Sequence, residues 1–332
     1  MIEADGLTKR YGQTLAVDDL SFQVRPGRVT GFLGPNGAGK STTMRMILGL
    51  DRPNSGTVRI DGQPYRSLHR PLRTVGALLD AKWVHPNRSA RAHLLWLAKS
   101  NKISTRRVDE VLGLVGLSAV AGRRAGGFSL GMSQRLGIAA ALLGDPRVLL
   151  FDEPVNGLDP EGILWIREFM HGLAAEGRTV FVSSHLLSEM SLTAQDLIVV
   201  GRGKLIAQST TAEFIAQAGD NAVRVRSPHA DTLRLALLDQ GFEVQVDGQA
   251  LVVPGASTDQ VGDIAGANGV VLHELSAQAG SLEQAFMRIT GDAVEYRTDA
   301  PALAADPTAA AVAAAAAADP DATIQLTHSG KK

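Results

Sequence analysis

The first 220 residues alternate short apolar runs with longer stretches of helical spacing. Strands that alternate with helices along a chain are typical of a parallel sheet with crossover helices. The segments 28–34, 147–154 and 178–185 carry nearly continuous apolar runs, as expected of strands buried on both faces. Residues 87–143 have a mostly helical pattern, which predicts a helical subdomain inserted between sheet strands.

A hairpin is predicted over 196–210, and a second unit begins near residue 220. The patterns in this unit run strand, helix, strand, strand, helix, strand, followed by a last helix at 281–290. This order predicts a small α+β ferredoxin-like domain over 220–292. The composition then falls mainly to Ala, Asp, Pro and Thr, so we expect residues 293–332 to form a disordered Ala-rich tail.

Composition narrows the class of protein. Hydrophobic residues make up 45% and charged residues 20% of 332 residues, which is typical of a globular chain. The formal net charge of −1 lacks the basic character of nucleic-acid-binding domains, so we expect no nucleic-acid partner. The absence of cysteine excludes disulfides and thiolate metal sites. The sequence shows neither a signal-peptide pattern nor an uncharged apolar stretch of about 18 residues. We therefore expect that any function at a membrane depends on a partner protein.

The segment GPNGAGKST at 34–42 matches the phosphate-binding pattern G-x-x-x-x-G-K-[ST], between a predicted strand and a predicted helix. Glycines let backbone N–H groups close around phosphate oxygens, and the helix start adds a favourable dipole. Lys40 can reach the β- and γ-phosphates, and the Ser41 hydroxyl can ligate Mg²⁺. We therefore expect a nucleoside triphosphate to be held by Gly34, Pro35, Asn36, Gly37, Ala38, Gly39, Lys40, Ser41 and Thr42.

Two carboxylates, Asp152 and Glu153, stand at the carboxyl end of the apolar run at 147–154. Ligands of parallel sheets bind at this edge. Adjacent strand residues point in opposite directions, so the two side chains should have different roles. Asp152 suits the Mg²⁺ shell, and Glu153 suits polarising the water that attacks the γ-phosphate.

Three further positions are ambiguous when taken alone. A lone histidine is more often structural, but His185 follows the apolar run at 178–185, where it favours a hydrogen bond to the γ-phosphate. Tyr11 suits either packing or stacking on adenine, a contact worth about 1–3 kcal/mol. The segment FSLGM at 128–132 precedes a helical stretch, and its Ser129 and Gly131 supply a hydroxyl and backbone N–H groups at a helix start. The residues leave open a working phosphate-contacting segment, a decayed one, or a simple helix start.

Taken in order, these features resemble the ATP-binding subunits of ABC transporters over about residues 1–220. The resemblance rests on Tyr11, 34–42, 128–132, Asp152 with Glu153, NGLD at 156–159, and His185. GLDP at 157–160, the ending at 281–290 and the small C-terminal unit resemble the drug- and antibiotic-export branch, typified by daunorubicin- and bacitracin-resistance ATPases. The resemblance implies a P-loop NTPase domain of ABC type over 1–219, with its helical subdomain at about 87–143.

The resemblance also implies ATP and Mg²⁺ as ligands. Tyr11 would stack on adenine, Ser41 and Asp152 would bind Mg²⁺, Glu153 would be the catalytic base, and His185 would sense the γ-phosphate. ATP would lie between two copies of the chain, each P-loop facing Ser129 and Gly131 of the other copy, with the loop of Asp159 crossing the interface. This homodimer would power a separate transmembrane permease at the cytoplasmic face of the cell membrane.

The sequence departs from the family pattern at two places. After the run at 73–79 the family usually has a glutamine that senses Mg²⁺ and couples to the permease, and here the residue is Asp80. An aspartate can bind a metal-bound water, but it is shorter and adds negative charge beside a triphosphate. In the segment 128–132, Leu130 replaces the family's first glycine and Met132 its glutamine. We expect Leu130 to point its side chain away from the nucleotide.

Other functions remain as alternatives. An ABC-type ATPase of translation or DNA repair usually carries two ATPase units, long coiled-coil insertions or basic surfaces, and none is visible in the sequence. A P-loop kinase lacks the signature segment and the histidine, and a GTPase needs an Asn-Lys-x-Asp base reader, which is absent. A regulatory module that binds ATP without turnover is disfavoured by Glu153.

Overall fold

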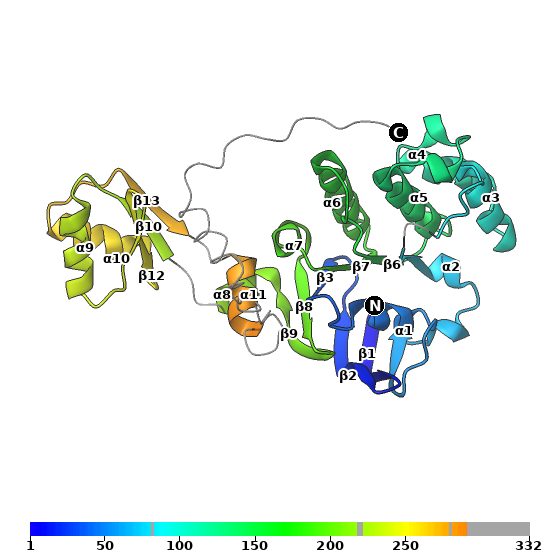
Figure 1. Ribbon diagram of the computed structural model, residues 1–332, viewed down its shortest axis with the longest axis horizontal. Coiled ribbons are helices and arrows are strands. Elements are labelled where there is room, and N and C mark those ends of the chain that lie inside the picture. Colours follow the sequence, from blue (N-terminus) through cyan, green and yellow to red (C-terminus); the bar gives the residue numbers. More distant parts are fainter. Residues whose placement is uncertain (81–82, 218–221, 279–280, 291–332) are drawn as a thin grey trace, which may run out of the picture. The chain divides into compact units, whose positions relative to one another are not determined.

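The computed structural model describes residues 1–80, 83–217, 222–278 and 281–290 (Figure 1). The predicted disordered tail at 293–332 lies outside the described residues. Among the described residues, no helix combines the length and apolar character that crossing a membrane requires.

A six-stranded sheet, in the order β5-β6-β7-β3-β8-β9, forms the centre of the described N-terminal part (Figure 1). The strands β5, β6, β7, β3 and β8 pair in parallel, and β9 pairs antiparallel with β8. The predicted parallel sheet and the hairpin at 196–210 are confirmed. The bounds are β3 (Val29–Leu33), β5 (Val75–Leu78), β6 (Val148–Asp152), β7 (Thr179–Ser184), β8 (Asp196–Gly201) and β9 (Lys204–Thr210).

Both faces of this sheet are buried, which explains its continuous apolar strands. Leu149 and Phe151 of β6 pack on the face covered by α5 (Leu130–Leu142), α6 (Pro160–Ala175) and α7 (Leu187–Thr193). Val148 and Leu150 alternate with them and pack on the opposite face, with α1 (Lys40–Ile47). Burying a large apolar side chain stabilises the fold by about 1.5–3 kcal/mol.

A three-stranded antiparallel sheet, which the sequence analysis did not predict, covers the α1 side of the central sheet. Its order is β2-β1-β4, with β1 (Ile2–Tyr11), β2 (Thr14–Val24) and β4 (Ser55–Ile60). Phe22 of β2 packs against Phe32 and Phe181 of the central sheet, with both ring-centroid distances 5.7 Å. This aromatic cluster joins the two sheets.

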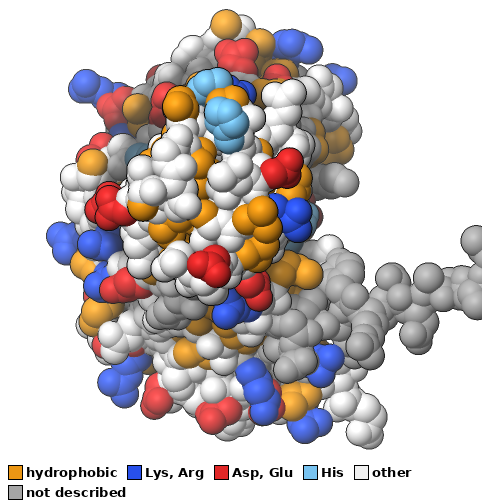
Figure 2. Space-filling model, turned by 90° about the vertical axis from the view of Figure 1, so that its left-hand side faces the viewer, with side chains coloured by type: hydrophobic (Ala, Val, Ile, Leu, Met, Phe, Trp, Pro, Cys, Tyr) orange, Lys and Arg blue, Asp and Glu red, His pale blue; other side chains and the backbone are white. Residues whose placement is uncertain are grey.

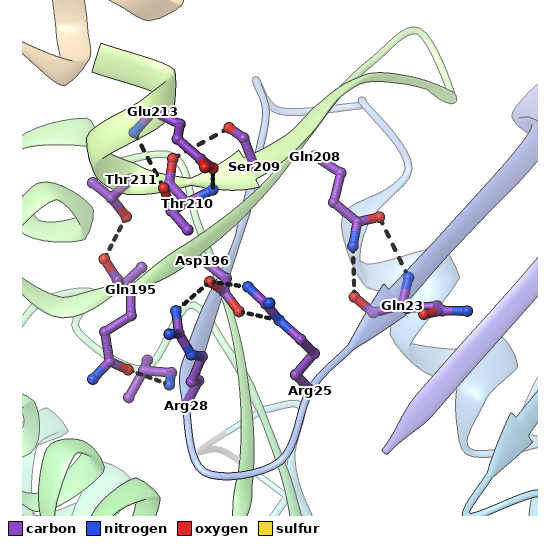
Figure 3. Close-up of polar contacts among 12 residues, drawn as sticks. Gln23, Arg25, Arg28, Gln195, Asp196, Gln208, Ser209, Thr210, Thr211 and Glu213 are labelled. Atoms are coloured by element: carbon purple, nitrogen blue, oxygen red, sulfur yellow. Dashed lines mark hydrogen bonds and ion pairs between the residues drawn. The ribbon is translucent and has the colours of Figure 1, made fainter. Parts of the chain in front are cut away.

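A charged cluster joins the two sheets near the start of β8 (Figure 3). This edge is opposite the segment 34–42, which follows the carboxyl end of β3. The carboxylate of Asp196, at the start of β8, is buried and accepts hydrogen bonds from Arg25 Nε and Nη2 at 3.0 and 2.7 Å. It also accepts one from Arg28 Nη1 at 2.9 Å. Arg25 follows β2 and Arg28 precedes β3, so the cluster fixes the turn between the two sheets.

The helical subdomain predicted at 87–143 is confirmed between β5 and β6. It contains α3 (Ala90–Ser100), α4 (Arg106–Leu114) and α5, and buried residues of all three helices belong to one hydrophobic cluster. The shorter helices of the N-terminal part are α2 (Pro71–Thr74), α8 (Thr211–Gln217) and the 3₁₀ turns at Tyr65–Ser67, Ser118–Val120 and Ala125–Gly127.

The C-terminal unit follows the predicted strand and helix order. It consists of β10 (Ala222–Arg226), α9 (Ala230–Asp239), β11 (Gln245–Asp247), β12 (Ala250–Pro254), α10 (Thr258–Ala267) and β13 (Glu274–Gln278). All strand pairs are antiparallel, in the order β11-β12-β10-β13, and the unit has its own hydrophobic cluster. The apolar side chains of Leu235 and Val246 are exposed on the C-terminal unit. In the face drawn in Figure 2, hydrophobic and charged side chains are interspersed.

The last described helix, α11 (Leu282–Thr290), packs differently from the sequence expectation. The sequence pattern assigns it to the C-terminal unit of 220–292. Its buried residues Leu282, Ala285 and Phe286 instead belong to the hydrophobic cluster of the N-terminal part, and the helix contacts α7 and α8. The amphipathic pattern indicates a helix with one apolar face but does not specify which surface that face covers.

Candidate nucleotide-binding site

The segment 34–42 forms the turn between β3 and α1, at the carboxyl edge of the parallel strands. A Cβ atom at Gly34 would lie 2.4 Å from the carbonyl oxygen of Val200, and one at Gly39 would lie 2.5 Å from that of Ala16. Both positions therefore require glycine. Gly39 is the N-cap of α1 and supplies no side-chain acceptor, so the first backbone N–H groups of the helix stay available to an anion.

Lys40 extends back over this turn, with its side chain 6% exposed. Its Nζ donates hydrogen bonds to the carbonyl oxygens of Gly34 and Pro35 at 2.6 and 3.2 Å. It also lies 3.5 Å from Oε1 of Glu153. Burial lowers the pKa of Lys40, and the charge of Glu153 partly opposes this. A desolvated ammonium at a helix start is a strong electrostatic partner for phosphate oxygens.

Asp152, Glu153 and His185 meet beside Lys40, because β6 and β7 are parallel neighbours that end at the same edge. Oε2 of Glu153 lies 2.9 Å from Nδ1 of His185. Glu153 has a left-handed backbone with φ of 48°, a conformation that costs a non-glycine residue about 1–2 kcal/mol. The structure therefore brings together Lys40, Asp152, Glu153 and His185, four of the five side chains that the sequence predicts at the γ-phosphate and the metal.

Ser183, which the sequence analysis missed, connects the two carboxylate residues. Its hydroxyl donates a short hydrogen bond to Oδ1 of Asp152 and accepts one from the backbone N–H of Glu153 at 3.0 Å. Two features of the sequence could have pointed to Ser183. It lies two residues before His185, and it lies at the end of a predicted strand. Its partner Asp152 lies 31 residues away, and only the register of β6 and β7 reveals the contact.

A Mg²⁺ ion fits the donor set of this edge. Within the described residues there is no group of three or more His, Cys, Asp or Glu side chains that could hold a metal without other ligands. Mg²⁺ is usually bound by one or two protein ligands together with phosphates and waters. The exposed hydroxyl residue Ser41 and the half-buried carboxylate residue Asp152 suit such a site.

Tyr11 lies at the end of β1, beside the start of α1. Its hydroxyl donates a hydrogen bond to Oδ2 of Asp51 at 2.6 Å, and Lys9 Nζ lies 4.9 Å from its ring centroid. Burial is the main cause that raises the pKa of Tyr11, and the hydrogen bond to Asp51 and its charge raise it further. A hydrogen bond with the side chain of Thr42 has the opposite effect. Tyr11 is 47% exposed, so its side chain is accessible for stacking next to the segment 34–42.

Asp80 follows β5 at the start of the segment that leads to the helical subdomain. It is exposed, and its carbonyl oxygen accepts a hydrogen bond from the backbone N–H of Trp83 at 3.4 Å. Together with Trp83 and Trp96 it lines a surface groove.

Ser129 and Gly131 belong to the helical subdomain. Ser129 is the N-cap of α5, and its Oγ accepts a hydrogen bond from Met132 N at 3.2 Å. The side chain of Leu130 rests on Gly157, where an added Cβ would lie 2.2 Å from Leu130 Cδ2. Leu130 is 42% exposed, and its side chain contacts the loop that follows Glu153.

Asp159 closes the same loop as the N-cap of α6. Its Oδ1 accepts a hydrogen bond from Gly162 N at 2.9 Å. The described contacts join neither Asp159 nor Ser129 to the P-loop of the same chain. In one chain the structure thus assembles Lys40, Asp152, Glu153 and His185. Ser129 and Gly131 lie at the start of α5 and Asp159 at the start of α6, and no described hydrogen bond joins them to the segment 34–42.

Comparison with known proteins identifies the family. Residues 17–156 match the family model of ABC transporters, and residues 221–283 match a domain of unknown function, DUF8746. The bacitracin transport ATP-binding protein BcrA of Bacillus licheniformis is 36% identical over 88% of this chain and 97% of its own length. The Nod factor export ATP-binding protein I of Paraburkholderia xenovorans is 34% identical over 87% of this chain and 97% of its own.

A solved ATP-binding subunit of an ABC transporter shares the fold with a TM-score of 0.60 and 27% identity, over 66% of this chain and 93% of that one. The relatives are thus matched along nearly their whole lengths, and the family match includes the P-loop and both carboxylates. The chain belongs to the ATP-binding subunits of ABC transporters, in the drug- and antibiotic-export branch, and it is an ATPase.

Proposed function

We propose that two copies of this chain bind ATP between them and power a separate membrane permease that exports a drug, an antibiotic or a lipid-like molecule. The observation that carries this proposal is the convergence of Lys40, Asp152, Glu153 and His185 at the edge of the sheet where the P-loop lies. The names of the relatives, which refer to bacitracin transport and Nod factor export, support export as the direction of transport.

The site residues have distinct roles in this proposal. Residues 34–42 cradle the triphosphate, Tyr11 stacks on the adenine, and Ser41 with Asp152 would hold Mg²⁺. When bound, Mg²⁺ neutralises part of the charge on the phosphate oxygens. Asp80, at the exit of β5, orients water near this metal site and links it to the permease.

Glu153 and His185 act on the attacking water and the γ-phosphate. The Glu153 carboxylate lies 3.5 Å from Lys40 Nζ and 2.9 Å from His185 Nδ1. A bound γ-phosphate would offer Lys40 charge-assisted hydrogen bonds in competition with Glu153. Glu153 is then able to accept a proton from water, while His185 donates a hydrogen bond to the γ-phosphate.

The second half of each site comes from a partner copy. One chain carries one P-loop and one signature segment, and Ser129 and Gly131 make no described contact with the P-loop of their own chain. We infer that Ser129, Gly131 and the loop of Asp159 face the ATP bound to the partner copy. The N-terminus of α5 then directs its backbone N–H groups at the γ-phosphate.

The permease docks in the groove beside Asp80. This groove has a volume of about 340 Å³ and lies between the central sheet and the helical subdomain. Leu50, Trp83 and Trp96 line it, and each is more than half exposed. Aromatic anchors of this kind dominate protein interfaces, and docking here would hold the chain at the cytoplasmic face of the membrane.

Affinity purification of the tagged full chain from detergent-solubilised membranes tests the partner. We expect a multi-spanning membrane protein to co-purify, and Trp83→Ala with Trp96→Ala to release it. Leu235→Ala, which changes an equally exposed apolar residue on α9, is the matched control and should leave the complex intact. Co-purification of ribosomes or DNA alone would contradict the transport function.

A further inference from the structure

Ser183 is fully buried at the end of β7, directly beside the last residue of β6. A hydroxyl group donates one hydrogen bond and accepts up to two. The Ser183 hydroxyl both donates and accepts here: it donates a hydrogen bond to the Asp152 carboxylate and accepts one from the Glu153 backbone N–H. This side chain is therefore connected to the proposed metal ligand and to the proposed base at the same time.

The hydrogen bond to Asp152 restricts the rotation of a carboxylate that is otherwise half exposed. A carboxylate that binds a metal is normally oriented by a hydrogen-bond donor behind it, and loss of such a donor typically costs 10–100-fold in metal affinity or activity. With one Asp152 oxygen engaged by Ser183, the second oxygen remains available to an ion at the carboxyl edge.

The hydrogen bond from Glu153 acts on the backbone. Glu153 has a positive φ of 48°, which is unfavourable for a residue with a side chain. Its N–H is anchored by Ser183 immediately before this left-handed turn. The turn directs the Glu153 carboxylate towards Lys40 and His185, so the anchor helps to set the position of the base.

We propose that Ser183 is a positioning residue of the ATPase, whose hydroxyl orients Asp152 towards Mg²⁺ and holds the backbone turn that places Glu153. This inference rests on the proposed roles of Asp152 and Glu153. It predicts that the hydroxyl matters for metal-dependent steps and leaves metal-free nucleotide binding unaffected, because residues 34–42 do not contact Ser183 in any described hydrogen bond.

The test compares Ser183→Ala, Ser183→Thr and the wild-type chain. Binding of a non-hydrolysable ATP analogue is measured with EDTA and across a Mg²⁺ titration, together with kcat and KM for ATP. We expect Ser183→Ala to require roughly tenfold more Mg²⁺, to lower kcat, and to bind the analogue normally in EDTA. Ser183→Thr keeps the hydroxyl and should restore most of the Mg²⁺ response.

Thr30→Val is the matched control. Thr30 lies on β3 next to β7, and its Oγ1 is buried without a hydrogen-bond partner among the described residues. Its replacement should change neither metal response nor kcat. The inference is contradicted if Ser183→Ala keeps the wild-type metal response and kcat, or if it loses affinity equally in EDTA, which indicates a structural role only. A wild-type chain that shows no Mg²⁺ response would instead contradict the proposed function.

Discussion

The ammonium group of Lys40 is held by carbonyl oxygens of its own loop and by Glu153, and it is largely shielded from water. Burial holds its folded-state pKa below the ordinary value of 10.5. Between these two pKa values the unfolded chain retains the proton that the folded chain has lost. The free energy of unfolding therefore rises with pH across that window, and below it the buried charge destabilises the nucleotide-free fold.

We expect Lys40→Met to abolish ATP binding while the nucleotide-free protein keeps or raises its unfolding temperature at neutral pH. The variant should also lose the rise in stability with pH in the window below 10.5. Thermal unfolding over a pH series measures both effects, with the exposed Lys99→Met on α3 as the control. A large fall in unfolding temperature would mean that Lys40 stabilises the loop instead.

Leu130 of the segment 128–132 contacts Gly157 in the loop that follows Glu153. Gly157 has a φ of 71°, and Leu130 occupies the space that a Cβ there would need. We expect Gly157→Ala to lower the ATPase rate and the stability. Leu130→Ala in the same chain should recover part of both, with a coupling of about 0.5–3 kcal/mol for residues in contact. Strictly additive effects in the double-mutant cycle would show that the pair is not coupled.

At the residue scale, the sequence predicts the P-loop, both carboxylates and His185, because each is tied to a local pattern. The structure brings these residues together, and their chemical roles stay predictions. Ser183 lacks such a pattern, since its contacts depend on the register between two strands. The packing of Leu130 on Gly157 depends likewise on a tertiary contact.

At the element scale, the strands of the parallel sheet were predictable because burial on both faces leaves continuous apolar runs. The three-stranded sheet β2-β1-β4 could not be predicted in this way. Its strand β1 mixes buried and half-exposed positions, and its pairing with β4 joins segments that lie far apart in the chain. Helix α11 was predicted as the last helix of the unit 220–292, and its apolar face packs on the hydrophobic cluster of the N-terminal part.

The cluster around Asp196 gives a prediction at this scale. Asp196→Asn removes the charge that holds Arg25 and Arg28 at the turn between the two sheets. Hydrogen bonds to charged groups contribute about 1.5–3 kcal/mol, so we expect a loss of about 2 kcal/mol in the free energy of unfolding. Denaturant unfolding measures it, and Asp239→Asn, an exposed position on α9, should have little effect.

At the scale of the whole molecule, α11 links the C-terminal end of the described chain to the helix that follows His185. Its buried Phe286 belongs to the same cluster as Met190 of α7 and Phe214 of α8. A change in this contact therefore acts on α7, the helix that follows His185. The C-terminal unit of 220–292 remains a candidate for dimer stabilisation, since two copies of a small sheet unit can pack isologously.

We expect Phe286→Ala to destabilise the protein by about 3 kcal/mol, as Phe-to-Ala changes in cores do. Met287→Ala, at a 66% exposed neighbour on the same helix, should stay within about 0.5 kcal/mol of wild type. Thermal and denaturant unfolding of the full chain provide the comparison. Equal effects of the two variants would show that α11 does not pack on the core through Phe286.

The dimer contribution of the C-terminal unit is testable by deletion. Removing residues 221–332 also removes α11 from the core, so we expect a lower unfolding temperature as well as weaker ATP-dependent dimerisation. Light scattering with and without ATP, at a temperature where the shortened chain is folded, separates the two effects. Unchanged dimerisation and ATPase activity would dismiss a role of the unit in the dimer.

The central claim is that Glu153 activates water on ATP held between two copies of the chain. The most direct measurement is the ATPase rate and the oligomeric state of Glu153→Gln in Mg²⁺ and ATP, compared with wild type and with Glu168→Gln, an exposed position on α6. We predict that Glu153→Gln binds ATP, accumulates as a persistent dimer and hydrolyses almost none of it, while Glu168→Gln behaves as wild type. Substantial turnover by Glu153→Gln, or a chain that stays monomeric with ATP bound, would contradict the account.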